Sequence, residues 1–315
     1  MTQPKRAEVG MPVIQFKKIL VPTDFSEASK KAVTYGLTLA SQFNAGVIIA
    51  HVVPESSALL YTFPTETFAI ERDQEQQARR EIAHLVPAEY TSQFDIQTIV
   101  KTGNIEAELL RMVDEGRVNL VVMGTHVRRY LGRWFLGSVT ERMLRKIPVP
   151  LLTVSHVDTE QHTIGLVAVK HILYAADLDE ASNSGLKYAI EFARASRAKL
   201  TVTHIVDHMD RILWGPALIA RLQGERAKLV QELKERVNNL VAQVKPADVE
   251  IDTAVVEGKP FEKLLEIADE RSIDMILINL QSKTMFERAF LGSTAERVVR
   301  LARVPVLSIP VTLGH

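Results

Sequence analysis

Two short segments in the first half of the chain carry groups that could hold phosphate. Met123-Gly124 closes an apolar run, and Gly137-Ser138-Val139-Thr140 opens an amphipathic pattern that continues to Lys146. A glycine at a strand end lets the backbone approach a ligand, and a helix N-terminus offers free N–H groups and a positive dipole end. Ser138 and Thr140 add hydroxyl donors, so the two segments predict a phosphate-binding crevice. Between them lie three cations that either steer a polyphosphate or form ordinary solvated surface, Arg128, Arg129 and Arg133.

The other motifs for phosphate chemistry or catalysis do not occur. The sequence has no Gly-x-Gly, no Gly-Lys-Ser/Thr and no Gly-x-Ser-x-Gly, which excludes the dinucleotide fingerprint, the P-loop and the nucleophile elbow. It has no cysteine, and its nine histidines show no ligand spacing on one helix. We therefore predict no catalytic residue and no metal site. The 38 basic and 38 acidic residues give a formal net charge of zero, which argues against a nucleic-acid partner.

The chain repeats itself at an offset of 153 to 155 residues. Lys18–Ser29 resembles His171–Ser182, and Phe135–Arg142 resembles Phe290–Arg297, with further matches in the same order between them. Duplication of a domain of about 150 residues explains this order. We predict a first domain over 11–157 and a second over 168–315.

Each half alternates short apolar runs with helical patterns. The runs of the first half are continuous, as in strands buried on both faces of a parallel sheet, and they are Lys18–Pro22, Val47–Val53, Ile96–Val100, Leu120–Met123 and Val149–Val154. A βαβ alternation with right-handed crossovers predicts a doubly wound open sheet in each half. The second half also has a long helical pattern from about 217 to 244. We expect its apolar stripe to pack in the core, and the stripe contains Leu218, Leu222, Leu229, Leu233, Val237, Leu240 and Val244.

Four segments together resemble the universal stress protein family in its tandem form. They are Pro22-Thr23-Asp24-Phe25-Ser26, His51-Val52, Met123-Gly124 and Leu136-Gly137-Ser138-Val139-Thr140-Glu141. The resemblance implies an α/β fold, the adenine-nucleotide α-hydrolase-like one, with two tandem doubly wound sheets of five mainly parallel strands and helices on both faces. It also implies that Val149–Val154 and Val304–Ile309 meet across the interface, so that the two domains form an intrachain pseudo-dimer. Whether two chains associate further stays open.

The resemblance implies a nucleotide site in the first domain. Nucleotide-binding members have Gly-x-x-Gly, nine residues, and then Gly-Ser/Thr, which corresponds to Gly124 and Gly137-Ser138 here. By that comparison Pro22, Asp24 and Val52 border adenine and ribose. The implied set is Pro22, Thr23, Asp24, Val52, Met123, Gly124, Val127, Gly137, Ser138, Val139 and Thr140. Val127 departs from the pattern because a β-branched residue replaces the second glycine, where a positive φ or close phosphate approach favours glycine.

The second domain departs further from the nucleotide-binding pattern. Asn279 and Ser282 stand where both loop glycines would be, and a weaker site is implied at Asp177, Asn279, Gly292 and Ser293. Two alternatives are open for the aspartates, because Asp24 and Asp177 could hold ribose hydroxyls or could brace the loop into the following helix. For His51 and His204 we expect a structural role, with a ring nitrogen bonded to backbone.

The leading functional hypothesis is a cytoplasmic regulatory protein of the stress response that binds ATP, with Mg²⁺, in its first domain and signals to an unidentified protein partner. We expect slow ATP hydrolysis at most. The N-terminus shows no export signal, and no apolar run is long enough to cross a bilayer. The main alternative is a nucleotide-free interaction module with degenerate glycine loops. A third hypothesis is an enzyme of the wider adenine-nucleotide α-hydrolase-like superfamily, for which no carboxylate cluster or poised base is evident.

Overall fold

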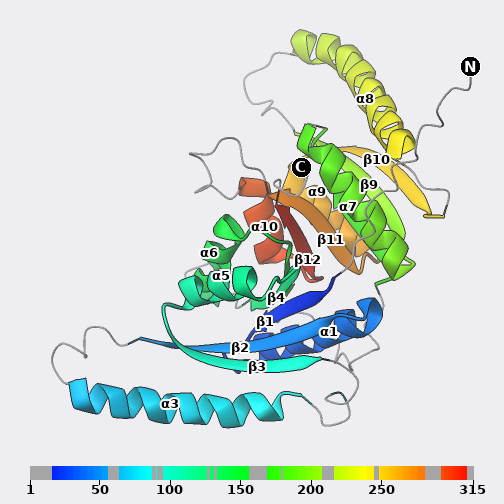
Figure 1. Cartoon of the computed structure of the whole chain (residues 1–315). Helices are drawn as coiled ribbons and strands as arrows, with labels where there is room; N and C mark the ends of the chain where they lie inside the picture. The colour runs from blue at the N-terminus through cyan, green and yellow to red at the C-terminus, as the bar shows by residue number, and fades with distance from the viewer. Residues whose placement is uncertain are drawn as a thin grey trace, which may run out of the picture.

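The two halves of the chain fold into two lobes of the same architecture (Figure 1). The computed structural model describes residues 16–55, 64–86, 90, 95–125, 128–130, 133–155, 169–178, 180–207, 216–244, 248–280 and 292–310. The four predicted domain limits, in 11–157 and 168–315, fall outside these ranges. None of the described helices combines the length and the apolar character that a membrane span requires.

The first lobe alternates strands and helices as the sequence predicts. Its sheet strands are β1 (Lys18–Pro22), β2 (Gly46–Pro54), β3 (Ile96–Gly103), β4 (Leu120–Thr125) and β7 (Leu151–Ser155). Its helices are α1 (Glu27–Phe43), α3 (Pro64–His84), α5 (Ile105–Glu115) and α6 (Ser138–Lys146). A short antiparallel hairpin, β5 (Arg128–Tyr130) and β6 (Arg133–Phe135), lies between β4 and α6 and forms a separate two-stranded sheet.

The second lobe repeats this order without a described hairpin. Its strands are β8 (His171–Ala175), β9 (Lys199–Val206), β10 (Ile251–Glu257), β11 (Met275–Leu280) and β12 (Val306–Pro310). Its helices are α7 (Glu180–Ser196), α8 (Pro216–Val244), α9 (Pro260–Glu270) and α10 (Ser293–Leu301). The sequence predicts a linker over residues 155–168, but Ser155 is the last residue of β7, and residues 156–168 lie outside the described ranges.

The two predicted five-stranded sheets join into one sheet of ten strands. Its order is β10-β9-β8-β11-β12-β7-β4-β1-β2-β3. Every pairing is parallel except β12 with β7, where Leu307 lies opposite Leu152 and the Thr153 hydroxyl donates to the Val306 carbonyl at 3.1 Å. The last strands therefore meet across the lobe interface, as the family resemblance implies, and the chain forms a pseudo-dimer within itself.

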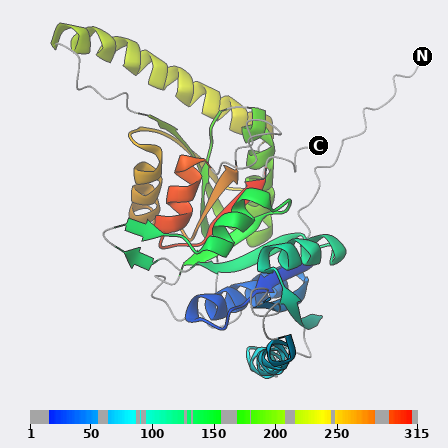
Figure 2. The same cartoon turned by 90° about the vertical axis from the view of Figure 1, so that its left-hand side faces the viewer.

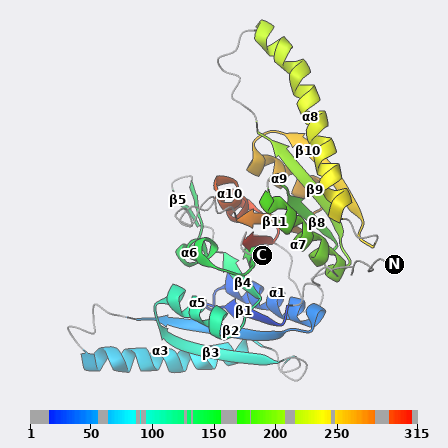
Figure 3. The same ribbon diagram turned by 45° about the horizontal axis from the view of Figure 1, so that its top comes forward.

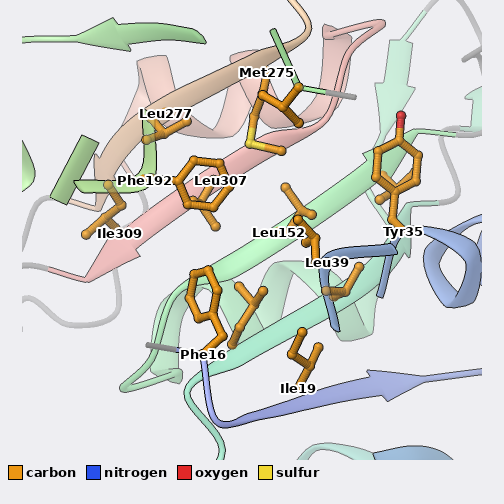
Figure 4. Close-up of a cluster of buried hydrophobic side chains, with 14 of the residues drawn as sticks. Phe16, Ile19, Tyr35, Leu39, Leu152, Phe192, Met275, Leu277, Leu307 and Ile309 are labelled. Atoms are coloured by element: carbon orange, nitrogen blue, oxygen red, sulfur yellow. The ribbon is translucent and has the colours of Figure 1, made fainter. Parts of the chain in front are cut away.

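Helices cover both faces of this sheet, and each face has its own apolar core that runs through both lobes. One core lies under α1, α3, α7 and α8, and the other under α5, α6, α9 and α10. On the first face an aromatic cluster crosses the lobe boundary: the Phe192 ring centroid lies 6.0 Å from that of Phe16 and 5.8 Å from that of Phe43. Figure 4 shows Phe16 and Phe192 among labelled buried hydrophobic side chains that come from both lobes. The two lobes are therefore joined by packing as well as by the sheet.

The long helices α3 and α8 cover the two opposite edges of the sheet and extend past it (Figure 3). Helix α8 has 29 residues, a length of about 44 Å, whereas the seven residues of β10 span about 23 Å. The prediction that the whole apolar stripe of α8 packs in the core is wrong for Leu229, which is 46% exposed. Toward the C-terminal end of the helix, Val237 and Val244 are buried against the sheet. The side chains of Leu218 and Leu222 lie outside the described residues.

Candidate functional site

A cavity of about 620 Å³ lies in the first lobe at the carboxyl ends of the strands. There β1 pairs with β2 on one side and with β4 on the other, so the strand order reverses, and open α/β sheets bind ligands at such a switch point. All of the predicted first-domain site residues except Val127 line it: Pro22, Thr23, Asp24, Val52, Met123, Gly124, Gly137, Ser138, Val139 and Thr140. Val127 lies outside the described residues. The structure thus brings together four segments that are far apart in the sequence.

The loop between β1 and α1 forms one wall of this cavity and is braced by its own side chains. Asp24 Oδ1 accepts from the Ser26 amide at 3.1 Å and from the Ser26 hydroxyl at 2.5 Å. Ser26 caps α1, because its hydroxyl accepts from the Ser29 amide. Thr23 Oγ1 accepts from the Phe25 amide, and Phe25 has a φ of 64°. Asp24 therefore holds the loop, and it also borders the cavity.

His51 supports the same loop from β2. Its Nδ1 lies 2.8 Å from the Thr23 carbonyl oxygen, and a carbonyl only accepts, so this nitrogen carries the proton. In the second lobe His204 Nδ1 lies 2.7 Å from the Ala176 carbonyl. The predicted backbone hydrogen bond is confirmed for both histidines. In the first lobe the Phe25 ring stacks on His51 at 4.6 Å between centroids.

Gly124 lies in β4 and has a packing reason to be glycine. A Cβ at this position would lie 2.4 Å from the carbonyl carbon and oxygen of Ala28 and 2.7 Å from the Ser29 nitrogen. A side chain here would meet the backbone of α1, whereas the position at a strand end predicts a glycine that lets the backbone approach a ligand. Gly124 still lines the cavity, but helix packing alone requires it.

Gly137 differs, because a Cβ there would meet only the Thr140 hydroxyl, at 3.9 Å. It is the N-cap of α6 with φ −57° and ψ 134°, and no side chain caps this helix start. The first-turn amides have no partner inside an α-helix. Ser138 is exposed, Thr140 is buried, and both line the cavity. The uncapped start of α6 therefore borders the cavity with hydroxyls and amides, the donor set that binds phosphate.

Apolar side chains from α5 and the neighbouring loops close the rest of the cavity, and sequence reasoning missed most of them. The additional lining residues are Ser26, Ser29, Ala50, His51, Ile105, Leu109 and Leu136. Ile105 and Leu109 are four residues apart on α5, whose N-cap Asn104 directly follows Gly103, where φ is 150°. An i, i+4 apolar pair right after a strand-ending glycine is the signal that could have found them.

The charges around this cavity are unevenly placed. Among its lining residues Asp24 is the one carboxylate, and no lysine or arginine is present. Two cations of α6 face away to α5, because Arg142 and Lys146 both pair with Glu106. The hairpin with Arg128, Arg129 and Arg133 lies between Gly124 and Gly137, and Figure 2 shows its two short strands beside α10 of the second lobe. The side chains of these arginines lie outside the described residues.

The second lobe presents a changed version of the site. Asn279 lies in β11, and its amide nitrogen donates to the Tyr174 hydroxyl at 3.0 Å, so its side chain points toward α7 and the sheet. A Cβ at Gly185 would lie 2.1 Å from Asn279 Oδ1, so this glycine of α7 makes room for the asparagine. Asp177 is exposed in the loop after β8, and Gly292-Ser293 start α10 with the same backbone as the start of α6. Ser282 lies outside the described residues.

Comparisons with known proteins agree with the fold. The family model described as "Universal stress protein family" matches residues 15–155 and again 168–310. Universal stress protein Rv2005c of Mycobacterium tuberculosis is 26% identical over 304 residues, which cover 92% of this chain and 95% of that protein. Universal stress protein MJ0577 of Methanocaldococcus jannaschii is 25% identical over 155 residues, 45% of this chain and 96% of that protein.

Among solved structures, a universal stress protein from Archaeoglobus fulgidus matches with a TM-score of 0.67 and 19% identity, covering 94% of this chain and 99% of that one. This likeness shows the fold over both lobes. The family model covers most of the chain in two copies, one for each lobe. The chain therefore belongs to the universal stress protein family, as a tandem member.

Proposed function

We propose that the first lobe binds an adenine nucleotide, ATP, and that the chain acts as a nucleotide-responsive regulatory protein in the stress response. The observation that carries this proposal is the cavity that joins an uncapped helix start to an apolar wall at the switch point of the sheet. A nucleotide has both characters, a flat apolar base and an anionic phosphate chain. The cavity volume of about 620 Å³ lies within the range of small-molecule sites.

The lining residues suggest how the ligand would lie. The base would rest against Val52, Leu109 and Met123, which form the apolar side. The phosphates would accept from the amides and hydroxyls of Ser138 and Thr140 at the start of α6. Asp24 also lines the cavity, and its carboxylate can accept from ribose hydroxyls.

Magnesium fits this arrangement only as a companion of the phosphates. The described residues contain no group of three His, Cys, Asp or Glu side chains that could hold a metal ion. Mg²⁺ is commonly held by one or two carboxylates together with substrate phosphates, and Asp24 is the only carboxylate of the described lining. The proposed role is therefore binding, with slow hydrolysis at most.

Calorimetric titration of two matched glycine variants tests the proposal. Gly137 and Gly292 are N-caps of α6 and α10, with φ/ψ of −57/134° and −57/138°. We expect wild type to bind one ATP per chain and Gly137→Ala to bind about tenfold more weakly, a loss of about 1.4 kcal/mol, because the methyl group occupies open cavity space. Gly292→Ala controls for helix capping and should leave the affinity unchanged. Two results would contradict a first-lobe site: an equal loss of ATP affinity in both variants, or no loss in either.

A nucleotide-free interaction module is the second candidate, and two observations favour it. Val127 stands where the second loop glycine of the nucleotide motif would be, and Gly124 already has a packing reason to be glycine. Val127→Gly separates the two candidates. If this variant binds ATP while the wild-type protein does not, the wild-type chain is an interaction module that has lost its ligand. If wild type binds ATP, the module interpretation fails.

A further inference from the structure

A second cavity of about 330 Å³ lies on the other side of the Asp24 loop, between that loop and α3. It is lined by Asp24, Phe25, His51, Val53, Pro54, Gln74, Gln77, Ala78 and Glu81. The stacked rings of Phe25 and His51, 4.6 Å apart, stand beside it. We call this cavity the α3 groove. It shares only Asp24 and His51 with the proposed nucleotide site.

The chemistry of the α3 groove favours a cation that also donates hydrogen bonds. Asp24 and Glu81 contribute carboxylates, and the side chains of Gln74 and Gln77 contribute amide oxygens. No lysine or arginine is present among its lining residues. Val53 and Pro54 add an apolar floor, on which the methylene stem of a long basic side chain can lie.

In the second lobe an arginine of the covering helix bonds to the equivalent loop. Arg236 on α8 donates from a guanidinium nitrogen to the Leu178 carbonyl at 3.4 Å, so a guanidinium bridges the gap between helix and loop. Leu178 corresponds to Phe25, because the repeat offset is 153 here and the two residues have φ values of 59° and 64°. The supporting histidine contacts of 2.7 and 2.8 Å also match, so the two loops have the same conformation.

The helices correspond as closely as the loops. Ala78 and Ile82 are buried one turn apart in α3, and Val237 and Val241 are buried one turn apart in α8. This alignment pairs Gln77 with Arg236, because Gln77 directly precedes Ala78 and Arg236 directly precedes Val237. Two large exposed apolar residues, Ile70 at 51% and Leu229 at 46%, fall into the same register.

Position 77 thus decides whether the space is filled from within the lobe. In the first lobe Gln77 carries no charge, and its amide nitrogen donates to Glu81 Oε1 at 2.7 Å along its own helix. We propose that the α3 groove binds a guanidinium group supplied from outside the lobe, from an arginine side chain of a partner protein or from a free guanidinium compound. This inference does not rest on nucleotide binding.

Calorimetric titration at fixed ionic strength tests the proposal with two probes, agmatine and the peptide acetyl-Gly-Arg-Gly-amide. We expect one site per chain, and at least tenfold weaker binding of the lysine peptide acetyl-Gly-Lys-Gly-amide. Tighter binding of the arginine peptide than of agmatine identifies a protein side chain as the ligand, and the reverse order identifies a free compound. Equal affinities support the shared guanidinium chemistry. No saturable binding of either probe overturns the proposal.

Three variants locate the site. Gln77→Arg supplies an internal guanidinium, as Arg236 does, and should weaken probe binding at least tenfold. Gln76→Arg adds the same charge at the exposed neighbouring position and should bind like wild type. Arg236→Gln should leave the stoichiometry at one, because Leu233 and Leu240 stand in the second lobe where Gln74 and Glu81 stand in the first. Wild-type binding by Gln77→Arg, or an equal loss in Gln76→Arg, would overturn the assignment. ATP titration of Gln77→Arg should return the wild-type affinity, so the two proposals fail separately.

Discussion

Gly124→Ala should destabilise the first lobe because its methyl group would enter the backbone of α1. The contact would be 2.4 Å to the Ala28 carbonyl group, and ordinary van der Waals contact begins at 3.4 Å, so the helix start must move by about 1 Å. Because the atoms involved are backbone, no side-chain rotation relieves the clash. Overpacking of this kind costs about 2–3 kcal/mol, or roughly 5–10 °C in melting temperature for a lobe of this size.

Urea denaturation of Gly124→Ala beside Gly137→Ala measures this effect. Gly137 has open space around its Cβ position and a φ that alanine adopts without strain, so its variant should stay within about 1 kcal/mol of wild type. Gly124→Ala should also weaken ATP binding, because Ala28 and Ser29 continue directly from the Asp24 loop. If Gly124→Ala were as stable as wild type, the account of this glycine as a helix-packing residue would be refuted.

Three further predictions concern the lobe interface, pH and the glycine loop. Phe192→Ala removes a buried ring that contacts Phe16 and Phe43, and it should lower the unfolding free energy by about 3–5 kcal/mol in urea titrations, whereas Phe192→Leu costs less. Burial raises the pKa of Tyr188, so the folded state keeps this proton when the unfolded chain releases it above about pH 10. The free energy of unfolding should therefore fall above this pH by up to about 1.4 kcal/mol per pH unit. Tyr188→Phe should show a smaller fall when unfolding is measured at about pH 9–11. Val127→Gly should tighten ATP binding at a functional first-lobe site, and calorimetry that shows no change would remove this position from the site.

The strands of the fold could be predicted from the sequence because they are buried on both faces. Continuous apolar runs such as Leu120–Met123, set between longer helical patterns, are typical of strands at the centre of a parallel sheet. The internal repeat also predicted that the second half has the same fold as the first. The extent of helix packing could not be predicted, because the exposure of Leu229 depends on how far β10 reaches beneath α8, and no local pattern records that length.

Ten residues that line the first-lobe cavity could be predicted from the sequence, but Ile105 and Leu109 and the packing reasons for several positions could not. Asp24 and Ser138 were found because they follow a strand and begin a helix, and such positions meet at one edge of the sheet. The packing role of Gly124 and the inward turn of Asn279 depend on distant partners, Ala28 in one lobe and Gly185 in the other. The local sequence around Gly124 or Asn279 does not indicate which distant residue each of them contacts.

The most direct test of the central claim is a calorimetric titration of the wild-type protein with ATP and magnesium. The account predicts saturable binding of one nucleotide per chain, at the first lobe, with the affinity lowered in Gly137→Ala and kept in Gly292→Ala. Native protein that gives no binding heat at high micromolar ATP would contradict it.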